Sequence, residues 1–171
     1  TTATMGDAPW NPTDPNESLA QFDMGSFTLA VGDVVSVSEN IVTPPVTKAL
    51  TLSALQVTSF NVATDTVSGV ATTGANVEVC VNIPGNCISR SITATGGIWT
   101  VDFTADHDLQ QGDNGWAAEY DADSDQTFYD WNIPNPHIQV RTNDDSVVAI
   151  SWPMGTALNL SINNPAPGAT D

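Results

Sequence analysis

Val77-Glu78-Val79-Cys80-Val81 decides the fold of this chain, because its β-branched residues alternate with other side chains at a period of two. That period indicates an antiparallel strand with one buried face. Similar alternation occurs in Val34–Ser38 and Val46–Leu52. Further strands are predicted at Ser89–Thr95, Ile98–Phe103, Trp116–Tyr120, His137–Arg141, Ser146–Trp152 and Ala157–Ile162. Gly, Pro, Asn or Asp residues separate these segments, a spacing typical of an all-β fold built from antiparallel β-sandwiches.

Helical periodicity is almost absent from the chain. Only the segment Pro15–Phe22 could turn helically, since Asp14 precedes it as an N-cap and Glu17 lies in its first turn. We expect at most one short turn of helix there.

The charge balance excludes several classes of partner. The 171 residues, enough for a sizeable core, include 20 Asp and Glu but only 3 Lys and Arg, which gives a formal net charge of −17. Nucleic acids and anionic membranes would be repelled, so neither is an expected partner. Because only 13% of the residues are charged and 40% are apolar, the composition is that of a folded protein and not of a disordered acidic tail.

An extracellular or cell-surface location is expected from the composition. Lys is scarce beside abundant Asp, Thr, Asn and Val, and salt or calcium outside the cell would screen the repulsion between carboxylates. No run of about 20 apolar residues occurs, so no membrane insertion is expected. Without an initiator Met or the apolar region of a signal peptide, the sequence is interpreted as a mature, processed chain.

Cys80 and Cys87 are the only cysteines. In an oxidising compartment we expect them to form a disulfide across a hairpin whose turn is Pro84-Gly85, because Pro presets the first turn dihedral and Gly accepts the positive one. A pair of buried thiols or half of a metal site are the alternatives. Zinc is disfavoured, because His107 and His137 lack ligand spacing.

A set of motifs follows in a fixed order between about residues 57 and 129. They are Thr66-Val67-Ser68-Gly69-Val70-Ala71, Gly74-Ala75-Asn76-Val77-Glu78-Val79, Gly97-Ile98-Trp99-Thr100-Val101-Asp102-Phe103, Leu109 to Gly112, and Ala117-Ala118-Glu119-Tyr120-Asp121-Ala122-Asp123. This order resembles the bacterial immunoglobulin-like modules of large secreted and surface tandem-repeat proteins. The resemblance implies a β-sandwich and a surface setting, without an activity. The chain departs from the pattern at the two cysteines and at Ser124, where the family often has glycine.

The domain organisation follows from that resemblance. We expect an immunoglobulin-like domain at 57–131, inserted into a discontinuous β-sandwich domain formed by 1–56 and 132–171. A weaker likeness to tandem-repeat surface proteins of filamentous bacteria lies in Phe27–Val37 and in Trp152-Pro153-Met154-Gly155-Thr156.

Asp121, Asp123 and Asp125 place three carboxylates at alternate positions of one loop. Calcium binds several oxygens at about 2.3–2.6 Å, and this spacing can supply them from one face of an extended loop. The match to a helix-loop-helix calcium loop is poor, because Gln126 stands where glycine is needed and Asn132 where a bidentate glutamate belongs. A solvated acidic loop is the alternative, so calcium is the one cofactor that the sequence suggests.

The aromatic residues leave a carbohydrate-binding alternative open. Trp99 and Trp116 lie inside alternating strands, where core packing is expected. Trp10 and Trp131 have polar or proline neighbours and are better candidates for an exposed sugar-stacking platform. His107 is expected on the surface, as is His137.

Two asparagines, Asn16 in Asn16-Glu17-Ser18 and Asn159 in Asn159-Leu160-Ser161, fit the N-glycosylation pattern. The pattern is short and frequent by chance. Asn16 lies in a Pro-rich polar loop and is the more accessible of the two.

The preferred function is that of a non-enzymatic structural subunit of an extracellular filament, sheath or adhesin. Its partners would be copies of itself or other surface proteins, joined head to tail. The assembly strand would be Thr1-Thr2-Ala3-Thr4-Met5, pairing with the open sheet edge of a neighbour, with closure inside one chain or covalent tandem repeats as alternatives. The alternative functions are a carbohydrate-binding module and a hydrolase. Hydrolysis by paired carboxylates needs two acids held together in a cleft, and no such pair can be distinguished in the sequence.

Overall fold

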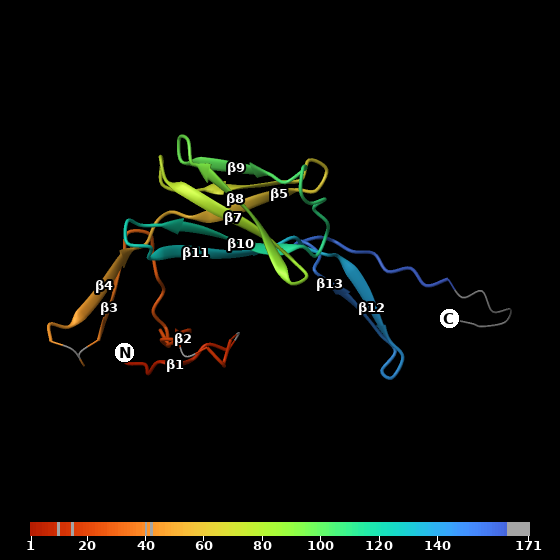
Figure 1. Cartoon of the computed structure of the whole chain (residues 1–171). Helices are drawn as coiled ribbons and strands as arrows, with labels where there is room; N and C mark the ends of the chain where they lie inside the picture. The colour runs from red at the N-terminus through yellow and green to blue at the C-terminus, as the bar shows by residue number, and fades with distance from the viewer. Residues whose placement is uncertain (10, 15, 40, 42, 164–171) are drawn as a thin grey trace. The chain divides into compact units, whose positions relative to one another are not determined.

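The computed structural model describes residues 1–163 apart from 10, 15, 40 and 42. The chain divides into two compact units, Thr1–Leu52 and Ser53–Asp171. Every strand pairing within each unit is antiparallel, and the described residues contain no helix (Figure 1). The fold is therefore all-β, as predicted, and the described residues of 16–22 do not use the one helical turn that the sequence allowed there. Pro15 lies outside the described residues, and Ser18–Leu19 forms a strand instead.

A β-sandwich of two sheets forms the centre of the second unit (Figure 1). One sheet has the order β5-β6-β9, and its strands are β5 (Gln56–Asn61), β6 (Thr66–Val70) and β9 (Ile98–Asp102). The other has the order β11-β10-β7-β8, and its strands are β7 (Asn76–Ile83), β8 (Asn86–Thr93), β10 (Asn114–Tyr120) and β11 (Gln126–Asn132). The faces that meet carry the apolar members of each alternating strand, as expected for a sandwich.

The core of the sandwich follows the sequence pattern that predicted it. Val77, Val79 and Val81 of β7 are fully buried, and Trp99 of β9 is 2% exposed. Phe103, directly after β9, is also fully buried. The alternate residues of these strands face outward, so the period of two in the sequence corresponds to the two faces of each sheet.

Gly69 in β6 makes room for Trp99, one of the two tryptophans of the core. A Cβ atom at Gly69 would lie 2.3 Å from the Trp99 side chain and 2.0 Å from the backbone oxygen of Gln56. The indole Nε1 of Trp99 donates a hydrogen bond to the carbonyl oxygen of Val70, at 3.0 Å. The glycine of one sequence motif and the tryptophan of another are thus packing partners on neighbouring strands.

The first unit contains two small sheets and almost no core. Strands β1 (Gly6–Asp7) and β2 (Ser18–Leu19) pair with each other, as do β3 (Val34–Glu39) and β4 (Val46–Thr51). Ala8 is the one buried apolar residue among those described in 1–52. Each hairpin therefore leaves the apolar side chains of its strands largely exposed.

A last hairpin in the second unit is formed by β12 (His137–Arg141) and β13 (Ser146–Ile150). Residues 151–163 follow it without a strand, drawn as a blue trace in Figure 1. The strand predicted at Ala157–Ile162 is therefore wrong for the chain by itself, because these residues have no partner strand. Strands β1, β2, β5 and β11, in contrast, occur where no strand was predicted. The pairing of 1–56 with 132–171 into one discontinuous domain stays a prediction.

Candidate functional site

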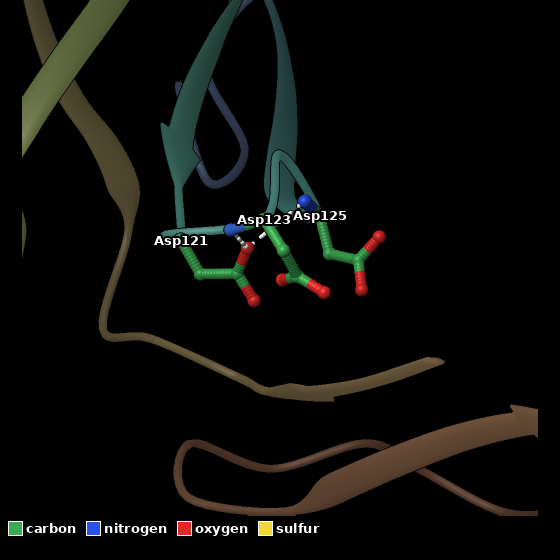
Figure 2. A group of neighbouring side chains, drawn as sticks. All are labelled: Asp121, Asp123 and Asp125. Atoms are coloured by element: carbon green, nitrogen blue, oxygen red, sulfur yellow. Dashed lines mark hydrogen bonds between the residues drawn. The ribbon is translucent and has the colours of Figure 1, made fainter. Parts of the chain in front are cut away.

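The turn between β10 and β11 brings Asp121, Asp123 and Asp125 together. One carboxylate oxygen from each lies within 4.8 Å of the others, and the three side chains project from the turn as drawn in Figure 2. Oxygen Oδ1 of Asp121 accepts hydrogen bonds from the backbone N–H groups of Asp123 and Asp125, at 3.1 and 2.9 Å. Asp121 thus organises the turn and leaves its second oxygen facing outward beside the other carboxylates.

The backbone of this turn has a conformation at position 124 that favours glycine. Ser124 has φ of 70°, in the left-handed region that residues with a Cβ atom adopt at a cost. The turn is short, because Gln126 already begins β11. A helix-loop-helix calcium geometry is therefore absent, and any cation would be bound by the hairpin turn alone.

The predicted disulfide between Cys80 and Cys87 is present, with their Cα atoms 5.9 Å apart. Cys80 lies opposite Ser89 and Cys87 opposite Asn82, so the bond runs diagonally across the β7–β8 hairpin. Gly85 in the turn has φ of 75°, as the Pro-Gly turn requires. A disulfide is typical of proteins outside the cytosol.

An aromatic patch lies on the outer face of the four-stranded sheet and consists of Trp116, Tyr120 and Phe128. The rings of Trp116 and Phe128 stack with centroids 5.6 Å apart at 27°. Tyr120 is 44% and Phe128 is 46% exposed. Burial raises the pKa of Tyr120 above its ordinary value, and the neighbouring Glu78 carboxylate adds to the effect through its charge and a hydrogen bond.

The positions of the tryptophans were only partly predicted. Trp99 is in the core, as expected. The core position expected for Trp116 is wrong, because it lies on the outer face opposite Cys80. The exposure expected for Trp131 is also wrong: it is 4% exposed and packs against Phe60, with ring centroids 5.4 Å apart. Trp10 lies outside the described residues.

His107 lies in the loop between β9 and β10, His137 begins β12, and each contacts a local partner. His107 Nε2 is 2.8 Å from Asp113 Oδ2, and both side chains are partly exposed. His137 Nδ1 is 2.8 Å from the carbonyl oxygen of Asn135. His137 is exposed, as expected, whereas His107 is half-buried.

An apolar groove of about 920 Å³ lies within residues 1–52. It is lined by Thr1–Ala3 and Met5 on one side and by Val35 and Val37 of β3 on another. The expected assembly strand Thr1–Met5 is exposed and belongs to no sheet, so the structure leaves its backbone available for pairing. Sequence reasoning did not find this groove, because its walls come from residues far apart in the chain.

Both candidate glycosylation sites are on the surface. Asn16 is exposed, and its side-chain amide donates a hydrogen bond to Asp14 at 3.0 Å. Asn159 is exposed in the extended segment after β13. Their modification stays a prediction.

Comparison with protein-family models, curated protein sequences and solved structures gives no significant match. Over the part of the chain that the structure describes, no helix is long and apolar enough to cross a membrane. The class that the fold defines is an all-β sandwich protein with one disulfide, and any narrower assignment is a proposal.

Proposed function

We propose that the protein is a non-enzymatic structural subunit of an extracellular filament, sheath or adhesin, whose copies assemble head to tail. The observation that carries this proposal is the exposure of apolar side chains outside the sandwich. Phe27 is 61% exposed, Val34 is 65% and Ile138 is 63%. Large apolar surface of this kind is typical of proteins that bind other proteins.

The sandwich of β5 to β11 would act in this assembly as an immunoglobulin-like module. Support comes from the packing of Gly69 against Trp99, which gives a physical reason for two of the motifs that carry the resemblance. The disulfide supports a location outside the cytosol, and an extracellular setting is part of the proposal.

Strand exchange by Thr1–Met5 would join the copies. In this arrangement the exposed backbone of Thr1–Met5 pairs with an open sheet edge of a neighbour, and backbone hydrogen bonds link subunits. Because the donor and the acceptor are different surfaces of one chain, the contact is heterologous and propagates into a fibre.

Negative-stain microscopy and sedimentation of the purified chain test this proposal. The expected result is filaments, or oligomers whose size grows with concentration. Replacing Thr1–Met5 by glycines of equal length should weaken assembly, because side-chain packing is lost and Gly disfavours strands. A chain that stays monomeric at high concentration would contradict the function, and equally stable filaments from the glycine variant would reject this strand alone.

Calcium at Asp121, Asp123 and Asp125 is a second part of the proposal. Bound calcium would neutralise the three neighbouring carboxylates and tie the ends of β10 and β11 together. A cation that binds only the native state stabilises it by about 2.7 kcal/mol when its concentration is a hundred times Kd.

Thermal melting in millimolar calcium and in chelator checks the calcium site. We expect the melting temperature to be higher in calcium and the difference to vanish in Asp123→Asn. Asp108→Asn, an exposed carboxylate of the same unit outside the cluster, is the matched control. Equal melting temperatures in calcium and chelator would remove calcium from the proposal.

A carbohydrate-binding module is the second candidate function, and the aromatic patch is the observation that favours it. The stacked rings of Trp116 and Phe128 lie on an outer sheet face beside partly exposed Tyr120. Aromatic faces of this kind stack on sugar rings. Retention of the protein on immobilised polysaccharides, compared between Trp116→Ala and the exposed control Trp152→Ala, tests this. Equal retention of the two variants would reject the patch as a sugar site.

A further inference from the structure

We propose that segment 157–162 of one copy inserts as an extended strand into the apolar groove of a second copy. The inference rests on the proposed function, because it names the contact through which copies would join. It names 157–162 of the neighbour as the strand edge with which Thr1–Met5 would pair, with β3 on the other side of that segment.

The groove offers an apolar floor and an open strand edge. Met5, Leu19, Leu29 and Val37 line it and are 59%, 39%, 44% and 48% exposed. Among the described residues β3 has β4 as its one partner strand, so its other edge from Val35 to Ser38 offers backbone N–H and C=O groups to an added strand. A strand added there would satisfy backbone hydrogen bonds and cover apolar side chains together.

Segment 157–162 has the complementary pattern. Leu158, Leu160 and Ile162 alternate with Asn159 and Ser161, so an extended backbone places all three aliphatic side chains on one face. The three are 46%, 64% and 76% exposed. No hydrogen bond joins this segment to the other described residues, so the pattern of a half-buried strand is present without its partner.

Charge favours this segment as the contact between copies. The whole chain carries a net charge of −17, so most surfaces of two copies repel each other. The sequence from Ser146 to Thr170 contains no charged residue and is the longest such run in the chain. Among the described residues that line the groove, only Glu39 is charged. An uncharged donor entering a nearly uncharged groove therefore avoids the repulsion that other contacts would meet.

A matched pair of charge substitutions tests the insertion. Leu160→Asp would bury an unpaired carboxylate in the groove and should weaken self-association by roughly a hundredfold or more. Ser161→Asp adds the same charge on the opposite face of the strand and should change association little. Sedimentation equilibrium measures both. If wild-type protein assembles and Leu160→Asp assembles equally well, the insertion is wrong and the proposed function stands. If wild-type protein does not assemble, both the insertion and the proposed function are wrong.

Cysteine cross-linking distinguishes a second copy from closure within one chain. Val37→Cys and Leu160→Cys, made in separate proteins and mixed under mild oxidation, should give a disulfide-linked heterodimer by non-reducing electrophoresis. Ser161→Cys mixed with Val37→Cys should give several-fold less, because its side chain faces away from the groove. A double variant that forms the bond as a monomer would overturn insertion between copies, and so would equal yields from Leu160→Cys and Ser161→Cys.

Discussion

Strand β7 of the sandwich and strand β3 of the first unit have the same sequence chemistry but differ in burial. Val79 in β7 is fully buried, whereas Val37 in β3 is 48% exposed. β7 has a partner on each edge and a facing sheet, whereas β3 has one partner strand, β4, among the residues that the structure describes. The alternating pattern sets which residues share a face, and burial of that face requires a second layer.

This difference separates a region with a buried core from hairpins whose apolar side chains are largely exposed. The sandwich buries aliphatic and aromatic side chains from both of its sheets. The apolar side chains of the β3–β4 and β12–β13 hairpins include Val46 at 56% and Val140 at 62% exposure. Isolated two-stranded hairpins are marginally stable in water, so these hairpins are the places where assembly has most to gain.

Substitution of Trp99 should show the difference between the sandwich and the hairpins most strongly. Trp99→Ala should lower the free energy of unfolding by about 3–5 kcal/mol, because it leaves a large cavity and removes the hydrogen bond to Val70. Ile138→Ala in β12 should change it by less than about 0.5 kcal/mol in dilute, monomeric protein. Urea unfolding followed by circular dichroism measures both. A large loss from Ile138→Ala would mean that this hairpin has a core of its own.

The period of two predicted most strands of the fold, and two of its failures have different physical reasons. In β11, Gln126-Thr127-Phe128-Tyr129-Asp130-Trp131-Asn132, aromatic and acidic residues replace the aliphatic alternation, so the strand exists because β10 pairs with it. In 157–162 the pattern is clear but no partner strand is present. Strand formation depends on a neighbour, which local sequence does not specify.

The parts of the candidate site that residues close in sequence form were predictable, whereas the parts that depend on strand register were not. The acidic turn is one loop and the disulfide joins cysteines 7 residues apart across one hairpin, so their spacing was informative. Trp116 was assigned to the wrong face because the inward residue of β10 is Ala117, which pairs with Val79 of β7. A shift of one residue in the pairing register exchanges the two faces of a strand, and the register is set by pairing with residues distant in the sequence.

Reduction of the disulfide should have the next largest effect. For a loop closed between Cys80 and Cys87, the chain-entropy estimate of its stabilisation is about 2.5 kcal/mol. Cys80→Ala/Cys87→Ala should unfold at correspondingly lower urea concentration while keeping the same strands by circular dichroism. Intact-mass measurement with alkylation but without reductant checks the premise, since two free thiols in that sample would contradict the bond.

Gly69→Ala tests the same difference between the two regions with a single added methyl group. Its Cβ would overlap the Trp99 ring and the Gln56 carbonyl, so the sheets must shift at a cost of about 1–3 kcal/mol. Gly6→Ala in β1 is the matched control, because nothing lies within 4 Å of the added Cβ. Equal melting temperatures for the two variants would show that the sandwich adapts to the methyl group.

The smallest expected effect on stability concerns Asp102, the last residue of β9. Its side chain is exposed, and hydrogen bonds hold its carboxylate in place. Hydrogen bonds from the hydroxyl and then the backbone N–H of Thr104, at 2.6 and 2.8 Å, lower the pKa of Asp102 from its ordinary value of 3.8. Because the folded pKa lies below the unfolded one, this stabilisation is present at pH values above the ordinary pKa and is lost as the pH falls through the folded pKa.

Thr104→Val removes the hydroxyl and keeps the N–H, so an NMR titration should show the Asp102 pKa moving back toward its ordinary value. In an Asp102→Asn background the same substitution should leave the acid dependence of unfolding unchanged, as a double-mutant cycle requires. If Thr104→Val shifts the acid unfolding equally in both backgrounds, the hydroxyl acts through packing and not through the Asp102 carboxylate.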